Sequence, residues 1–346
     1  MRYLSFLVVL LLFSIQSFSQ VTWDSSNNFI AKFNSGASNE IIIPTNPNFP
    51  NAVYSVAWME DGGTFPQDVR SQINLTGDTT AVLSFTLEPN TDYIVQITGG
   101  LDALYFNNIA QASQLIEIQQ WGTIQWASME NAFYGCDNLT ITASDNPNLS
   151  SVSNMSSIFR ECTQLNADLS AWNVASVNDM SFAFQGASNF NNDLSAWDVS
   201  NVTSMNSMFA NATSFNQDLG LWTISSMSDM SNMLDDSGLD CDNYSQTLIG
   251  WNSNTNTPNG VTLGANGLDY NNTAVNAREN LTNVKSWTIV GDVILLPTFA
   301  FANLIEICNG DVPPTLALNS NEGVSGSWSP STIDNTTSGT YLFTPN

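Results

Sequence analysis

The residues of this chain best suited to chemistry are acids that recur at a fixed interval. One aspartate column repeats every 25 residues, at Asp168, Asp193 and Asp218. An aspartate in a tight turn commonly accepts hydrogen bonds from the backbone N–H groups of that turn, and we favour this Asx-turn role. Carboxylates are also ligands of hard cations. A calcium site at these three aspartates is therefore the alternative, and calcium is the only cofactor that the sequence suggests.

Two further columns share this interval. An asparagine column stands at Asn166, Asn191 and Asn216, and we expect it to satisfy turn backbone as a ladder. A tryptophan column stands at Trp172, Trp197 and Trp222. Indole rings bury a large area, so we predict that this column belongs to the core. The alternative is an exposed platform on which sugar rings stack, which would make the chain a carbohydrate-binding module.

The composition argues against catalysis. The 346 residues include no histidine, which removes the commonest general base, the Ser-His-Asp and Cys-His arrangements and most zinc sites. No glycine-rich phosphate loop with its lysine is present. A pair of carboxylates of the glycosidase kind remains, but 31 acids make chance pairs common. We predict that the protein is not an enzyme.

The columns belong to a repeat that must position them. Its clean copies start at Val152, Val177 and Val202. Alternation at Trp172 and Val174 favours a short strand, while Met180, Ala183 and Phe184 have the i, i+3, i+4 spacing of a helical turn. Repeats of this size are typical of solenoids. The predicted fold class is an α/β solenoid of leucine-rich-repeat type, with units of about 25 residues, flanked by small all-β, sandwich-like segments.

One copy carries a family resemblance. The stretch FNNDLSAWDVSNVTSMNSMF, residues 190–209, resembles the BspA-type leucine-rich repeat surface proteins, a repeat domain of unknown function. The resemblance covers about 115–292. We place the repeats at 113–234 and a C-terminal cap of the solenoid at 235–292, with a helix near 271–282. The family implies an extracellular surface protein, often discussed as an adhesin, and it implies no catalytic residue.

The flanking segments differ from the repeats. Residues 1–19 combine Arg2 with an apolar run too short to span a bilayer, as in a secretory signal peptide. Residues 20–112 alternate short apolar runs with turn residues, and W-M-E-D-G at 58–62 resembles the W-G-D-G of PKD-like domains. Residues 293–346 resemble an Ig-like β segment, which we expect to be truncated. The expected location is secreted or on the surface of a bacterial cell.

The net charge limits the classes of partner, and the cysteines indicate the compartment. Removal of residues 1–19 takes away one of six basic residues and none of 31 acids, which changes the formal charge from −25 to −26. Such a surface repels nucleic acid and anionic membranes, and no segment of the exported chain is expected to span a membrane. Cys136 and Cys162 fall in adjacent units and form a candidate disulfide of an oxidising compartment.

These observations predict a non-enzymatic, secreted or cell-surface protein for adhesion or macromolecular recognition. The expected partner is an extracellular protein or glycan. Two alternatives stay open, a carbohydrate-binding module and a structural spacer within a larger surface protein. Exposed aromatic residues would favour the first alternative, and a face without aromatic or charged clusters would favour the second.

Overall fold

The computed structural model describes residues 27–37, 39–63, 68–76, 81–83, 87–295, 315–320, 324–333 and 341–346. The chain divides into two compact units, Met1–Ile294 and Leu295–Asn346. The predicted signal peptide, residues 1–19, lies outside the described residues. Among the described residues, no helix is both long enough and apolar enough to cross a bilayer.

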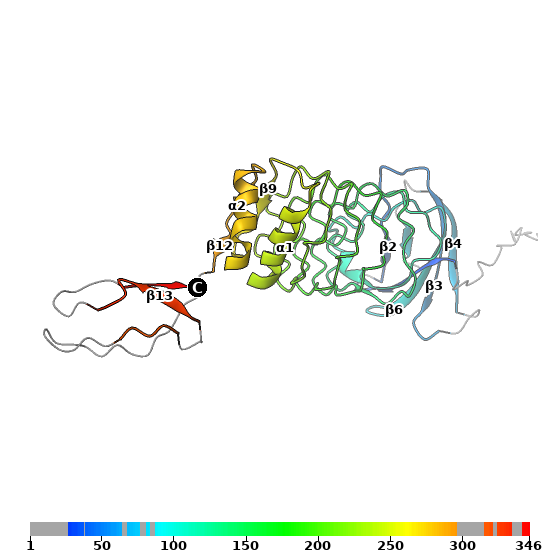
Figure 1. Cartoon of the computed structure of the whole chain (residues 1–346). Helices are drawn as coiled ribbons and strands as arrows, with labels where there is room; N and C mark the ends of the chain where they lie inside the picture. The colour runs from blue at the N-terminus through cyan, green and yellow to red at the C-terminus, as the bar shows by residue number, and fades with distance from the viewer. Residues whose placement is uncertain are drawn as a thin grey trace, which may run out of the picture. The chain divides into compact units, whose positions relative to one another are not determined.

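The first unit begins with a six-stranded sheet in the order β4-β3-β6-β1-β7-β8 (Figure 1). Its strands are β1 (Phe29–Asn34), β3 (Val53–Glu60), β4 (Arg70–Thr76), β6 (Asp92–Gly99), β7 (Leu115–Gln120) and β8 (Thr140–Ile141). The central pairs are antiparallel, whereas β7 and β8 run parallel. A separate two-stranded sheet joins β2 (Ile41–Ile43) to β5 (Ala81–Leu83). The sheet thus continues from the N-terminal segment into the first repeat.

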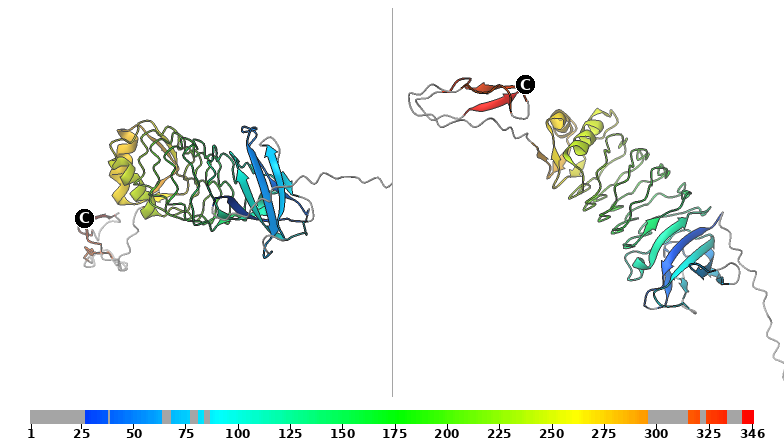
Figure 2. Two further views of the ribbon diagram at one scale, coloured as in Figure 1. Left: turned by 90° about the vertical axis from the view of Figure 1, so that its right-hand side faces the viewer. Right: turned by 90° about the horizontal axis from the view of Figure 1, so that it is seen from below.

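The repeat units that follow are stacked on one another (Figure 2). Between residues 142 and 240 the chain forms neither helix nor continuous strand, only turns and isolated parallel bridges one repeat apart. In each unit four alternate amides donate to carbonyl groups of the next unit. In one unit these bonds of 2.8–3.0 Å run from Met180, Phe182, Phe184 and Gly186 to Ser204, Asn206, Met208 and Ala210. Every second backbone donor on this face is therefore satisfied across units.

Left-handed residues explain why the predicted helical turn does not form. Phe182 has φ 61° and Gly186 has φ 70°, and an α-helix cannot contain such residues. Both positions are left-handed in the neighbouring units as well, at Asn131, Gly135, Ser157, Glu161, Ser207, Asn211, Asn232 and Asp236. The intervening amides close tight turns, such as Ala183 to the Met180 carbonyl at 3.1 Å. The i, i+3, i+4 spacing therefore reports successive turns that point apolar side chains inward.

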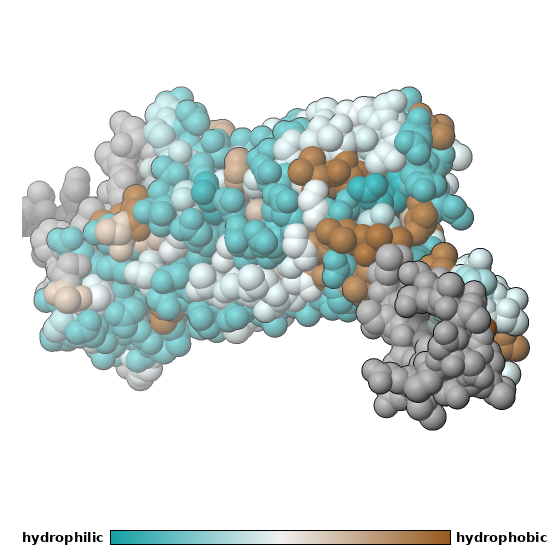
Figure 3. All heavy atoms as spheres, turned by 90° about the vertical axis from the view of Figure 1, so that its left-hand side faces the viewer, coloured by the Kyte–Doolittle hydropathy of each residue, from teal (hydrophilic) through white to brown (hydrophobic). Residues whose placement is uncertain are grey.

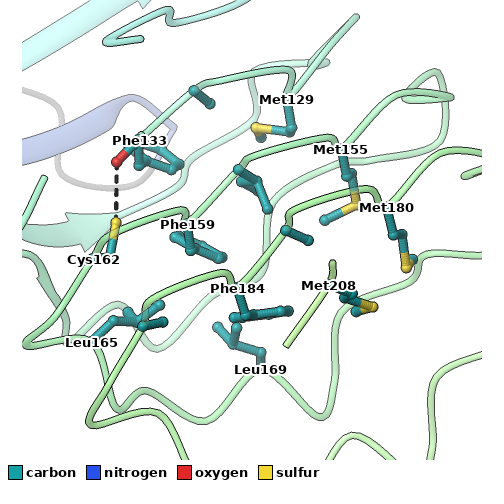
Figure 4. Close-up of a cluster of buried hydrophobic side chains, with 14 of the residues drawn as sticks. Met129, Phe133, Met155, Phe159, Cys162, Leu165, Leu169, Met180, Phe184 and Met208 are labelled. Atoms are coloured by element: carbon teal, nitrogen blue, oxygen red, sulfur yellow. Dashed lines mark hydrogen bonds between the residues drawn. The ribbon is translucent and has the colours of Figure 1, made fainter. Parts of the chain in front are cut away.

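The core runs through the stack as columns of like side chains. Phe133, Phe159, Phe184 and Phe209 are fully buried, and successive rings lie 5.5–5.6 Å apart between centroids. Figure 4 shows part of this column beside methionines that occupy one position in successive units. Met129, Met155 and Met180 are buried as well, so both columns belong to the core. One hydrophobic cluster extends from Phe29 to Trp287, so the sheet and the repeats share a core.

The unit ends with two helices and short parallel strands. Helix α1 (Cys241–Ser253) begins at Asp240, whose side chain accepts the Asn243 N–H, and helix α2 (Val275–Asn283) follows the 3-10 turn Asn272–Ala274. The helix expected near 271–282 is thus observed. Strands β9 (Thr262–Gly264) and β11 (Thr288–Val290) pair with each other, as do β10 (Asp269–Tyr270) and β12 (Val293–Ile294). Figure 3 shows hydrophobic residues at the surface toward this end of the unit. Val284 and Val293, which belong to this end, are exposed.

The predicted α/β solenoid of leucine-rich-repeat type is contradicted. The described chain consists mostly of small mixed sheets, and its two short α-helices both lie beyond residue 240. The expected strand and helix of each unit are absent because cross-unit pairing is limited to isolated bridges and left-handed residues break every helical turn. The described residues of the flanks do not show the expected sandwiches either. The N-terminal one has the single larger sheet, and the described part of the second unit has one hairpin, β13 (Gly326–Ser329) with β14 (Leu342–Pro345).

Candidate functional site: the repeat columns and an acidic hollow

The aspartate column forms Asx turns, as predicted. Each carboxylate accepts the backbone N–H two residues on, from Ser170, Ser195 and Gly220, at 3.0, 2.8 and 2.8 Å. Hydrogen bonds from the Ser170 side chain and backbone lower the pKa of Asp168 below its ordinary value of 3.8. In the part of the chain that the structure describes, no group of three or more His, Cys, Asp or Glu side chains could hold a metal ion. The three aspartates therefore lie in successive turns and are not gathered into a calcium site.

The asparagine column is a continuous ladder along the surface. The Asn166 side-chain oxygen accepts the Asn191 N–H at 3.1 Å, and the Asn191 oxygen accepts the Asn216 N–H at 2.8 Å. Asp240 continues the series, because its N–H donates to the Asn216 side chain at 2.9 Å. The predicted ladder is confirmed, although it lies at the surface and not in buried turns. The side-chain oxygens of the column accept backbone N–H groups of the next unit.

The tryptophan column is buried, as predicted. Trp172, Trp197 and Trp222 are 4%, 3% and 1% exposed, which leaves no ring face for a sugar. The indole N–H of Trp197 donates to the Leu169 carbonyl at 2.9 Å, and the indole of Trp222 makes the same bond one unit later. Trp251 in α1 continues this pattern by donating to Leu219 at 3.0 Å, a role that sequence spacing did not reveal. Trp197, Trp222 and Trp251 thus each join two units.

The candidate disulfide is not formed. Cys136 and Cys162 are buried free thiols in adjacent units, and Cys162 Sγ donates to the Phe133 carbonyl at 3.1 Å (Figure 4). Burial raises the pKa of both thiols well above their ordinary value, so neither is a reactive thiolate. Cys241 is also free, and Cys308 lies outside the described residues.

A hollow of about 570 Å³ opens where three strands of the N-terminal sheet meet. Its lining comes from the end of β3, the start of β4 and the start of β6. The ladder places Trp58 opposite Arg70, and Glu60 opposite Tyr93. A tight turn closes the end of β3, where the Gly63 N–H donates to Glu60 and Gly62 takes a left-handed φ of 89°. This turn is the M-E-D-G stretch that the sequence singled out only as a domain resemblance.

The walls of the hollow are mainly acidic. Glu60, Asp61, Asp68 and Glu88 face one basic lining residue, Arg70. Asp61 is tied down by Lys32 Nζ, which lies 2.8 Å from its carboxylate. This hydrogen bond is the main reason that the pKa of Lys32 is raised. Glu60 and Glu88 are exposed at the rim of the hollow.

Two aromatic residues form the inner wall of the hollow. Tyr93 is 4% exposed, and its hydroxyl accepts the Glu88 N–H at 2.8 Å, which fixes the segment that carries Glu88. Trp58 is 5% exposed, and its indole N–H is buried without a hydrogen-bond partner. An unsatisfied buried donor costs about 1–3 kcal/mol. Of the lining residues, Trp58 is therefore the one whose polar group most needs a further partner.

One buried ion pair lies outside both regions. Arg278 of α2 binds Asp292 through two hydrogen bonds of 2.7 and 2.6 Å, and the Asp292 side chain is only 1% exposed. The Tyr244 hydroxyl of α1 also donates to this carboxylate at 3.1 Å. Burial, with the Asp292 charge, raises the pKa of Tyr244 well above its ordinary value. The pair joins the two helices to the last strands and is structural.

Comparison with known families gives one match. Residues 127–251 match the family model described as "Mycoplasma protein of unknown function, DUF285". The match covers the stacked repeats and α1, and it leaves the acidic hollow outside. No curated protein and no solved structure matches the chain. The BspA-type, PKD-like and Ig-like resemblances, and the expected domain limits, stay predictions.

Proposed function

We propose that the protein is a secreted or cell-surface binding protein that recognises extracellular macromolecules and performs no catalysis. The observation that carries this proposal is the register of the stack. Equivalent exposed positions recur in successive units, so a partner meets the same side chains at regular intervals along one surface. Stacked repeats of this kind commonly present extended binding surfaces.

The chemistry of the chain supports binding more than catalysis. The sequence contains no histidine, and the repeated acids are held in Asx turns. The proposal also holds that residues 1–19 direct export of the protein. The strongly acidic composition agrees with a partner other than nucleic acid. Adhesion to a neighbouring cell or matrix is the role that fits these features best.

Binding of the full chain to an array of matrix proteins and glycans tests the proposal. Two variants ask whether the repeats carry the binding. Ala196→Arg and Ser214→Arg each place a bulky charge at an exposed position of the stack. We expect one of them to abolish binding to the captured partner while the melting temperature is unchanged. A partner that binds both variants as well as wild type would contradict a role for the stack, and an array without any binder would contradict the proposal.

A further inference from the structure

One arginine of the stack, Arg160, is held between two aromatic rings. Its guanidinium carbon lies 4.8 Å from the centre of the Tyr134 ring in the preceding unit and 5.3 Å from the centre of the Phe182 ring in the following unit. Both distances are within the range of a cation–π interaction. The arginine side chain is 30% exposed, so the rings fix a cation at the surface of three successive units.

The guanidinium of Arg160 has no hydrogen-bond acceptor within the described residues. The nearest acid is Glu161, whose carboxylate oxygen lies 3.9 Å from Nε, beyond hydrogen-bond distance, and whose side chain is 48% exposed. Nε is buried without a partner, but the terminal nitrogens of the guanidinium are open to solvent. These terminal N–H groups are therefore free to donate end-on to a carboxylate, in the paired geometry that arginine favours.

Phe182 is an unusual residue for its position. Its φ of 61° is left-handed, and the neighbouring units have Ser157 and Ser207 at the equivalent left-handed position. A bulky ring is rare in this conformation and costs backbone strain. The ring is half-buried and does not belong to the hydrophobic core, so core packing does not explain it. Its contact with Arg160 is the interaction that the strained position provides.

The charge of the chain selects among anionic ligands. Arg160 is the only basic residue between Arg70 and Arg278, in a chain of formal charge −25. A polyanion such as a sulfated glycan would meet a single cation within an acidic field and would be repelled. A protein surface that is otherwise neutral or basic avoids this repulsion, and one carboxylate on it meets the arginine. Apolar side chains beside that carboxylate then contact the two rings.

We propose that Arg160, with Tyr134 and Phe182, is a docking site for a carboxylate of a partner protein whose surface is otherwise neutral or basic. The terminal nitrogens of Arg160 donate to the carboxylate, and the rings hold the plane of the guanidinium. Because the arginine is already fixed, binding costs less side-chain entropy than it would at a mobile arginine. This inference rests on the proposed binding function and names a surface of the stack and the chemistry that it recognises.

The test measures binding of the full chain to short peptides immobilised on a sensor surface. One peptide has a central glutamate flanked by leucines, with lysines at both ends, and its twin has glutamine in place of the glutamate. The ratio of the two affinities reports the carboxylate, because the apolar and lysine contacts are the same in both peptides. Heparin serves as the polyanionic probe.

Three variants and one control locate the binding. Arg160→Gln removes the charge, and Arg160→Lys keeps the charge without the planar group. Phe182→Ser removes one ring and introduces the serine of the neighbouring units, so it preserves folding. Asn173→Asp is the matched control. It makes the same change in net charge as Arg160→Gln, at an exposed position where the next unit has Asp198.

We expect wild type to prefer the glutamate peptide about tenfold. Arg160→Gln should abolish this preference, Arg160→Lys and Phe182→Ser should reduce it, and Asn173→Asp should retain it. Raising the salt from roughly 0.05 M to 0.5 M should weaken it. The inference is overturned if glutamate is not preferred, if the preference survives Arg160→Gln, or if heparin binds at Arg160 instead. A partner from the matrix array that binds wild type and all three variants equally would reject the site and retain the proposed function.

Discussion

Polar side chains serve different ends in the repeats and in the hollow. In the stack, the asparagine ladder and the aspartate turns satisfy one another's backbone across and within units. In the hollow, the Trp58 indole N–H is buried without a hydrogen-bond partner. Four acidic residues and one arginine, Arg70, line the same hollow. The more regular pattern is thus the structural one. A repeated column of chemically capable residues is weaker evidence for a site than an irregular group whose hydrogen bonds are incomplete.

The repeats are held together by interactions that join successive units. The unit that contains Phe184 is fixed to the next by four backbone hydrogen bonds and by the stacked rings of Phe184 and Phe209, and the Trp197 N–H ties the next unit back to Leu169. The sheet, in turn, continues into the first unit through β7 and β8. The strands that line the hollow therefore share a continuous hydrophobic core with the stack.

The largest expected effect is on stability, from Trp197→Ala. The side chain is 3% exposed in the central clean unit, so its loss leaves a cavity and removes one of the two hydrogen bonds that the Leu169 carbonyl accepts. We expect the free energy of unfolding to fall by about 3–5 kcal/mol. Trp197→Phe, which keeps much of the packing, should cost less. A melting temperature that Trp197→Ala leaves unchanged would show that the repeats do not depend on this column.

A smaller effect is expected at the left-handed column of the stack. Gly186 and Glu161 occupy equivalent positions with φ 70° and 59°. Gly186→Ala should cost about 1 kcal/mol through backbone strain alone, because the added Cβ would lie 3.5 Å from the nearest atom, Glu161 Cγ. Glu161→Gly relieves such strain and should stabilise the protein by about 0.5 kcal/mol.

Urea unfolding of the two variants measures both signs. Opposite shifts would establish that the turns, and not side-chain contacts, set the cost at this position. A loss of stability in Glu161→Gly as large as that in Gly186→Ala would argue against the left-handed column.

The smallest effect is a pH dependence at the start of α1. Hydrogen bonds from the Asn216 side chain, and then from the Asn243 backbone, lower the pKa of Asp240 below its ordinary value of 3.8. A lowered pKa in the folded state gives stability that is present above pH 3.8 and is lost as the pH falls through the folded value. Asp240→Asn keeps a capping oxygen without the charge.

Thermal melts from pH 6 down to about pH 2.5 measure this effect. We expect Asp240→Asn to be less stable than wild type near pH 6, and the two stabilities to converge as acidification protonates Asp240. Parallel curves for the two proteins at all pH values would show that ionisation of Asp240 does not stabilise the C-terminal cap.

The sequence predicted correctly those residues whose position depends mainly on one property of the side chain. The spacing of Trp172, Trp197 and Trp222 was enough to predict burial, and asparagine chemistry was enough to predict the ladder. The prediction of a helical turn was wrong because i, i+3, i+4 spacing also arises from successive tight turns. Glycine or asparagine at Asn131, Gly135, Gly186, Asn211 and Asn232 carried the missing signal, since these residues favour left-handed φ.

The hollow could not be predicted from local pattern. Its lining comes from three strands that the sheet register brings together, with Trp58 opposite Arg70 and Glu60 opposite Tyr93. The sequence shows W-M-E-D-G as a short motif, but the missing partner of the Trp58 N–H depends on the tertiary packing around it. A missing hydrogen-bond partner of this kind can be recognised only in the folded structure.

The free energy of urea-induced unfolding tests the central contrast most directly. The double variant Asn191→Ala/Asn216→Ala removes two steps of the ladder, and Glu60→Gln/Glu88→Gln neutralises two acids of the hollow. We expect the ladder variant to lose about 2–3 kcal/mol and the hollow variant to stay within about 0.5 kcal/mol of wild type. Equal losses in both would contradict the account, because the acids of the hollow would then be as structural as the asparagines of the stack.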